Sequence, residues 1–107
     1  MDSPYTYFTD LAALTAVPPE DSIVSRTLHN SDAMKVTLFT FAAGQALSEH
    51  TASMPAVLHF VSGQARLTLG GDEQIAQANT WVAMAANLPH SIVAETAVTM
   101  LLIMIKR

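Results

Sequence analysis

Two histidines in apolar stretches are the side chains of this sequence best suited to chemistry. His50 lies in "SEHTASMPAVLHFVSG" (residues 48–63), and His90 ends "NTWVAMAANLPH" (residues 79–90). Imidazole can bind a transition metal, transfer a proton near neutral pH, or orient a bound ligand through hydrogen bonds. Each of these roles requires a fold that positions the two rings, so the surrounding elements must be considered next.

Several other kinds of site are excluded by composition. The chain has no cysteine, which rules out disulfides, thiolate zinc sites and thiol catalysis. Ser91 is adjacent to His90 only in sequence, and no further residue completes a Ser-His-Asp signature. The basic residues are scattered and form no stripe that could follow a phosphate backbone, so nucleic-acid binding is not expected. They are Arg26, Lys35, Arg66, Lys106 and Arg107.

The bulk composition predicts one compact soluble domain over residues 1–107. Half of the 107 residues are hydrophobic, 13% are charged and the net charge is −4, which is unlike a disordered chain. The longest apolar run, Met100–Ile105, is far shorter than the roughly 20 residues that cross a bilayer. The N-terminal stretch carries acids and no basic residue, unlike a secretory signal. We therefore expect a cytoplasmic protein without membrane contact.

The first 33 residues are predicted to form an arm and an edge strand. Residues 9–14 ("TDLAAL") can form a helical turn with Thr9 as its N-cap. The breaker "AVPPEDS" at 16–22 separates this turn from a predicted strand over 22–28, and "HNSD" at 29–32 is predicted to be the following turn.

Residues 34–105 read as a succession of short strands. Strands are predicted over 34–44, 56–63, 80–85, 90–95 and 98–105, and a hairpin over 65–76 turns at Gly70-Gly71. Turn signals at a spacing of about ten residues are typical of a β-sandwich or barrel. The alternative is a helix over the alanine-rich residues 75–87, which Asn79, Asn87 and Pro89 disfavour.

The stretch Gly44–Gly63 resembles the first motif of the small cupins. That motif has a glycine, two histidines one residue apart, a glutamate and a closing glycine. Here Gly44, His50 and Gly63 match, while Ala52 replaces the second histidine and Ala56 replaces the glutamate. The resemblance implies the fold and leaves the motif's metal ligands incomplete.

The stretch Asn79–His90 resembles the second cupin motif. His90 matches its histidine. The other positions are replaced: Asn79 and Asn87 stand at the two glycines, Ala85 at the proline and Ala94 at the asparagine. The resemblance covers about residues 34–105 and implies an all-β jelly-roll barrel, a double-stranded β-helix, with a short N-terminal arm. The family's metal set of three histidines and a glutamate is matched only at His50 and His90, which excludes a complete four-ligand site.

Alternation along the strands of such a barrel predicts a small apolar pocket around the two histidines. Gln45 and Gln64 are candidate polar groups in it, whereas Glu49, His59 and Trp81 are expected on outer faces. The predicted lining residues are Phe39, Phe41, Ala52, Ala56, Leu58, Phe60, Val82, Met84 and Ile92.

Three functions compete for His50 and His90. They can bind a divalent transition metal (iron, nickel, copper, manganese or zinc) with non-motif ligands, in a dioxygenase- or isomerase-like enzyme. They can transfer protons without a metal, as in sugar epimerases that resemble this chain, but Tyr5 and Tyr7 lie in the arm. They can also orient a small molecule in a binding or regulatory protein. We expect a small-molecule-binding barrel, with the metal-dependent enzyme as the alternative.

A homodimer is the expected assembly. The segments "YTYFTDL" (5–11) and "SIVSRTL" (22–28) are apolar and β-prone, and they would leave open edges in an isolated barrel. Small cupins that resemble this chain commonly dimerise by exchanging such a strand. The low charged fraction also favours a surface covered by a second subunit.

Overall fold

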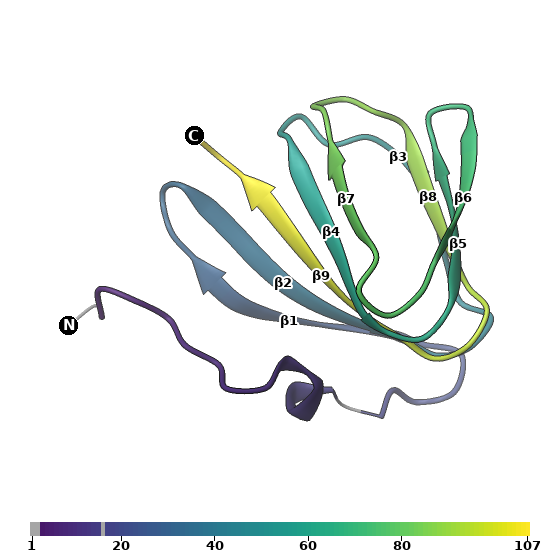
Figure 1. The fold of residues 1–107 in the computed structure, drawn as a ribbon, viewed down its shortest axis with the longest axis horizontal. Helices are drawn as coiled ribbons and strands as arrows, with labels where there is room; N and C mark the ends of the chain where they lie inside the picture. The colour runs from purple at the N-terminus through teal and green to yellow at the C-terminus, as the bar shows by residue number, and fades with distance from the viewer. Residues whose placement is uncertain (1–2, 16) are drawn as a thin grey trace.

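The computed structural model describes residues 3–15 and 17–107, and in these residues nine strands form two antiparallel sheets (Figure 1). The larger sheet has the order β1-β2-β9-β4-β7 and the smaller the order β3-β8-β5-β6. This confirms the all-β jelly-roll barrel. The strands are β1 (Ile23–Asn30), β2 (Met34–Phe41), β3 (Ala46–His50), β4 (Ala56–Ser62), β5 (Ala65–Leu69), β6 (Asp72–Ala76), β7 (Trp81–Met84), β8 (His90–Ala94) and β9 (Val98–Ile105).

The core lies between the two sheets and is supplied by alternate residues of the strands. On β4, for example, Ala56, Leu58 and Phe60 are buried while the residues between them are partly exposed. Opposite strands contribute the same pattern, as in Leu67 of β5 and Ile92 of β8, which are cross-strand partners. The period of two confirms that these segments are half-buried strands.

The strand expectations were right at most positions and wrong at two, His29 and β3, and the helical alternative did not form. The segment 75–87 forms β6, a turn and β7, so the helical alternative is wrong. β1 continues to Asn30, so His29 belongs to a strand and not to the predicted turn. β3 is an additional strand that had no β-propensity signal, because "ALSEH" contains no β-branched or aromatic residue.

The predicted hairpin turn at Gly70-Gly71 is confirmed. Leu69 and Asp72 are the last cross-strand partners of β5 and β6, which leaves the two glycines as the loop. Gly70 has φ of 62°, a left-handed conformation that two-residue hairpin loops require and that glycine adopts without strain.

All four glycine positions of the two motifs adopt left-handed backbone. Gly44 and Gly63 have φ of 84° and 89°, and Asn79 and Asn87, which replace the motif glycines, have φ of 74° and 66°. Asparagine tolerates this region better than other non-glycine residues. The replacements therefore preserve the turns of the second motif.

The N-terminal arm runs beneath the larger sheet (Figure 1). A short 3-10 helix, η1 (Leu11–Leu14), is capped by the carboxylate of Asp10, which accepts a hydrogen bond from the Ala12 N–H at 3.1 Å; the cap is thus not Thr9. Thr15 Oγ1 lies 3.1 Å from Thr99 Oγ1 and fastens the arm to β9. Among the described residues, no helix is long and apolar enough to span a membrane.

Candidate functional site

The two histidines meet at one end of the barrel. His50 ends β3, His90 begins β8, and the two residues are direct cross-strand partners. Their ring centres are 4.1 Å apart with an angle of 59° between the ring planes, so the imidazoles are in contact. The loops β3–β4 and β7–β8 and the β5–β6 hairpin close this end (Figure 1).

A β-bulge in β3 decides which side chain faces His90. Leu47 pairs with Ile92 and His50 pairs with His90, so two residues of β3 oppose the single residue Ser91 of β8. In a regular ladder, Glu49 would have stood opposite His90. Bulges change the direction of a side chain by inserting one residue, and here the extra residue brings an imidazole to this position in place of a carboxylate.

Each imidazole is held by the backbone of its own chain segment. His50 Nδ1 lies 2.8 Å from the Ser48 carbonyl oxygen, and His90 Nδ1 lies 2.9 Å from the Leu88 carbonyl oxygen. A carbonyl oxygen only accepts hydrogen bonds, so each Nδ1 carries the proton. In the neutral ring, Nε2 is then the atom with the free lone pair. The sequence pattern gave no signal for these two carbonyl partners.

The free nitrogen of His90 is accessible although the residue is buried. His90 is only 6% exposed, and its Nδ1 is used by Leu88. Within the described residues, the Nε2 atom of His90 forms no hydrogen bond. Every fully buried side-chain nitrogen or oxygen of these residues has a hydrogen-bond partner. The Nε2 atom must therefore account for part of the remaining exposed surface. His50, at the outer side of the pair, is exposed.

The loops around the pair are held together by backbone hydrogen bonds. Leu69 is the second cross-strand neighbour of His90. The Asn87 N–H donates to the Ala52 carbonyl at 2.7 Å and joins the two loops. The Gly70 N–H donates to the Pro89 carbonyl at 2.7 Å and joins the hairpin to the start of β8. These bonds fix the loops on either side of the imidazoles.

The predicted lining residues belong to the interior of the barrel. Ala52 is half-buried in the β3–β4 loop, and Phe39 and Val82 are half-buried against the core, the Phe39 ring centre lying 6.3 Å from that of Phe41. The remaining six residues are buried in the packed core: Phe41, Ala56, Leu58, Phe60, Met84 and Ile92.

Gln45 and Gln64 do not join the histidines. The Gln45 backbone pairs with Ala94 at the far end of β8, and the Gln64 carbonyl accepts hydrogen bonds from Glu95 and Thr96. Both therefore lie at the opposite end of the strand that His90 begins. Strand alternation predicts the face on which a residue lies but not the end of the barrel that it reaches.

The residues present do not fit the cupin metal set. Among the described residues, no group of three or more His, Cys, Asp or Glu side chains is placed to hold a metal ion. Ala52 and Ala56 supply no ligand. The site offers two nitrogen donors and no third.

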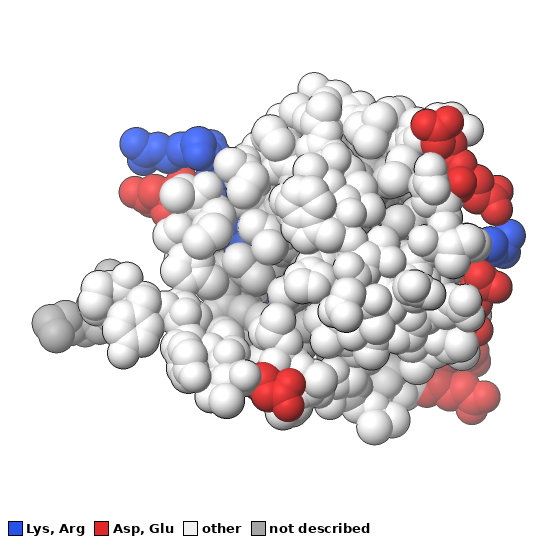
Figure 2. Space-filling model, in the orientation of Figure 1, with Lys and Arg blue, Asp and Glu red and all other residues white. Residues whose placement is uncertain are grey.

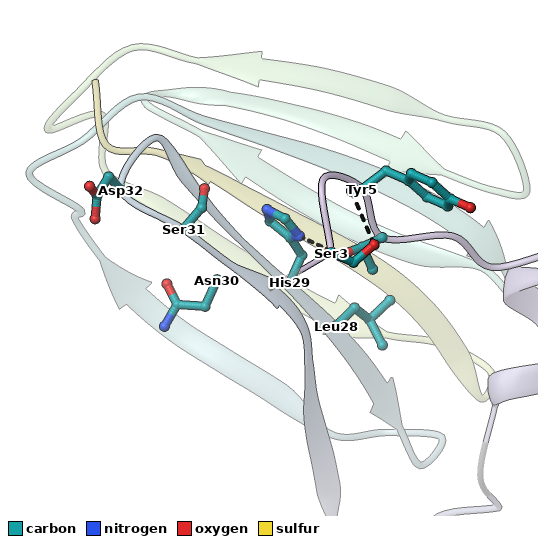
Figure 3. A pocket seen from close by; sticks show the side chains of 8 residues that line it. Ser3, Tyr5, Leu28, His29, Asn30, Ser31 and Asp32 are labelled. Carbon is teal, nitrogen blue, oxygen red and sulfur yellow. Dashed lines mark hydrogen bonds between the residues drawn. The ribbon is translucent and has the colours of Figure 1, made fainter. Parts of the chain in front are cut away.

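A separate pocket of about 570 Å³ lies outside the barrel, between the arm and the end of β1 (Figure 3). His29 Nδ1 forms a hydrogen bond of 2.8 Å with Thr6 Oγ1 across it. The sequence motifs did not point to this pocket. Its lining residues are Ser3, Tyr5, Thr6, Leu28, His29, Asn30, Ser31 and Asp32.

His59 and Trp81 lie on the outer face of the larger sheet, as expected. They are cross-strand partners on β4 and β7, and each is adjacent in its strand to residues of the opposite, inner face. Trp81 is 61% exposed. Neither side chain belongs to the imidazole pair.

No family model matches the chain, and no curated protein does. Solved structures do. A conserved protein of unknown function from Streptococcus pyogenes, SPY1581, is 26% identical over 98% of this chain and 91% of its own, with a TM-score of 0.84. A cupin superfamily protein from Desulfitobacterium hafniense is 24% identical over 97% and 94%, with a TM-score of 0.85.

A third similar structure is the cupin 2 conserved barrel domain protein from Leptotrichia buccalis. It is 29% identical over 90% of this chain and 46% of its own length, with a TM-score of 0.81. The sheet order, the two motifs and these likenesses agree. The chain has the fold of the small RmlC-like cupin domains.

Proposed function

We propose that this protein binds a small molecule at the end of the barrel where His50 and His90 meet. The observation that carries the proposal is the accessible Nε2 of the buried His90, next to a second imidazole with the same backbone anchor. Small-molecule sites commonly combine apolar walls with a few fixed polar atoms. Here Leu69 supplies apolar surface beside two nitrogen acceptors.

A role in binding is supported over proton-transfer catalysis by the missing partner groups. The bulge in β3 turns Glu49 away from His90. Tyr5 and Tyr7 are 71% and 72% exposed on the arm and belong to no element of the barrel. A histidine base that abstracts a proton usually works beside an acid or an oriented hydroxyl, and neither motif supplies one.

The metal-dependent alternative has one observation in its favour. Imidazoles that bind metals usually donate the second ring N–H to a carbonyl or carboxylate, and both histidines do so here. Such an enzyme would need further ligands from outside the motifs. The first measurement of the test is therefore the metal content of the protein.

The test combines elemental analysis with ligand binding. Untagged protein prepared without chelators is compared with His50→Ala and with His59→Ala, which removes a histidine from the outer face. We expect no metal above the level of His50→Ala, together with small-molecule binding that needs His50 and His90 but not His59. One metal ion per chain that is lost only in His50→Ala would contradict the proposal and support the metal-dependent enzyme instead.

We further propose a homodimer in which a second copy covers the outer face of the larger sheet. The outward positions of β9, β4 and β7 carry no charged side chain, so their burial desolvates no charge. In Figure 2 the charged side chains lie mostly toward the two sides of the molecule.

A cytoplasmic location is also proposed. A chain with no cysteine needs no oxidising compartment for its stability. Cell fractionation with antibody against the natural chain checks this location, and recovery in a membrane or extracellular fraction would contradict it.

A further inference from the structure

We infer that the ligand of the histidine pair is an uncharged molecule that presents a hydroxyl group to Nε2 of His50 and His90. This inference rests on the proposed small-molecule site and names the chemical class of its ligand. It follows from the direction of the hydrogen bonds at the two rings and from the absence of acids among the groups gathered there.

The first step is the polarity of the site. Both Nδ1 atoms donate to carbonyl oxygens, at 2.8 Å from Ser48 and 2.9 Å from Leu88. The neutral rings therefore have no N–H left for a ligand and offer only lone pairs. A carboxylate or phosphate ester dianion has only acceptors, so it would face these lone pairs without forming a hydrogen bond. A ligand must bring the proton.

The second step is the charge of the ligand. An ammonium group also donates protons, but burying it requires a compensating anion. No described group of three or more acidic, histidine or cysteine side chains gathers here, and the bulge takes Glu49 out of register with His90. The neighbours of His90 in the sheet are Leu69 and His50. A hydroxyl satisfies the acceptors without carrying a charge into this environment.

The third step is the position of the acceptors. His90 is 6% exposed and keeps its Nε2 accessible, while His50 is exposed at the outer side. A ligand that reaches the Nε2 of His90 therefore also meets the exposed ring of His50, which lies in contact with it. Adjacent hydroxyls, as in a diol, can use both rings.

The experiment begins with the ring nitrogens themselves. Long-range proton–nitrogen NMR correlations at a pH where the rings are neutral report which nitrogen of each histidine carries the proton. We expect Nδ1–H on both His50 and His90. A proton on Nε2 of either ring would overturn the inference, because the site would then offer a donor.

The same spectra are then followed during titration with three probes of matched shape: isobutanol, isobutylammonium and isobutyrate. We expect isobutanol to move the Nε2 signals of His50 and His90, with His29 and His59 as internal references that stay unchanged. The other two probes should cause smaller shifts. His90→Asn can retain an N–H for the Leu88 carbonyl and has no acceptor at the place of Nε2, and it should weaken isobutanol binding by about tenfold.

The outcomes separate the inference from the function on which it rests. Stronger binding of isobutyrate or isobutylammonium at these two rings would overturn the hydroxyl ligand and leave the small-molecule site standing. No shift at either ring with any of the three probes, up to their solubility, would count against the small-molecule site itself and would overturn both proposals.

Discussion

Gly63 occupies a position where both backbone conformation and space exclude a side chain. Its φ is 89°, and a Cβ atom there would overlap the Ala97 carbonyl oxygen and lie 2.8 Å from Val98 Cα. Both obstacles are backbone atoms, which cannot rotate away. Gly44 has a similar φ of 84° but nothing within 4 Å of the added atom. The two glycines that bound the first motif therefore differ in their physical reason for being glycine.

This difference predicts unequal effects of one added methyl group. Gly44→Ala should lower the free energy of unfolding by about 1–2 kcal/mol, the cost of left-handed backbone for a non-glycine residue. Gly63→Ala should cost at least about twice as much, because the start of β9 must also shift. Urea titration followed by circular dichroism measures both values, and equal losses would show that the contact at Gly63 is relieved easily.

The two histidines should also differ in their importance for stability. His50→Ala removes an exposed ring and should change the free energy of unfolding by less than about 0.5 kcal/mol. His90→Ala removes a ring that is 6% exposed and leaves the Leu88 carbonyl without its donor, which should cost about 1–3 kcal/mol.

Thermal unfolding of both variants beside the natural chain checks this pair of values. A large loss of stability in His50→Ala would indicate that the outer imidazole is needed to hold the barrel together. That result would assign the imidazole pair to the fold and weaken its assignment as a ligand site.

At the scale of elements, the turn between β7 and β8 positions the site through Asn87. Its φ is 66°, and its N–H donates to the Ala52 carbonyl across the two loops. Asn87→Gly keeps both properties and should leave stability and the proximity of the histidine rings unchanged. Asn87→Val places a β-branched residue in left-handed backbone and should cost about 2 kcal/mol.

The measurement is an NMR distance between ring protons of His50 and His90 in both variants, together with their unfolding curves. Loosening of the β7–β8 turn in Asn87→Val should lengthen that distance while the rest of the barrel is retained. If Asn87→Gly separates the rings as far as Asn87→Val does, the asparagine side chain and not its backbone conformation positions the loop.

The sequence was sufficient for the barrel because most strands carry their own signal. The hairpin at Gly70-Gly71, the alternation of β4 and the apolar β9 each follow from local residues. β3 carries no such signal, since "ALSEH" owes its strand conformation to pairing with β8. Tertiary pairing overrides propensity here, which is why this strand was missed.

The juxtaposition of the histidines could be expected from the motifs, but its chemistry could not. The bulge that turns Glu49 away is a property of the pairing between β3 and β8. The hydrogen bonds of the ring nitrogens to Ser48 and Leu88 are local geometry that residue types do not encode. The pocket at His29 arises because the arm folds back along β1, a long-range event without a sequence motif.

For the whole molecule, the outer face of the larger sheet leaves apolar side chains exposed to water when the chain is alone. The arm covers the outer face near Thr99, where Leu38 and Leu101 are 3% and 6% exposed. It does not cover Trp81 at the β7 edge, which is 61% exposed. Exposed aromatic side chains on charge-free surfaces are common at the centre of protein interfaces.

The proposed homodimer predicts that Trp81→Ser produces a monomer. Light scattering after size exclusion should give twice 11.5 kDa for the natural chain and a single chain mass for the variant. Ile75→Ser is the matched control, because Ile75 is a 56% exposed apolar residue on β6 of the other sheet. Dissociation in both variants, or a natural chain that is already monomeric, would contradict the proposed interface.

The fluorescence of the single tryptophan provides an independent test of the same interface. Trp81 is the only tryptophan of the chain, so its fluorescence reports one position. In the proposed dimer the indole is desolvated, and dilution through the dissociation constant should move its emission to longer wavelength as the ring meets water. A spectrum that stays constant while the mass halves would place the interface elsewhere, at the edge of β1 or on the arm. Since the imidazole pair lies at the end of the barrel and the indole on its outer face, ligand binding should persist in the Trp81→Ser monomer.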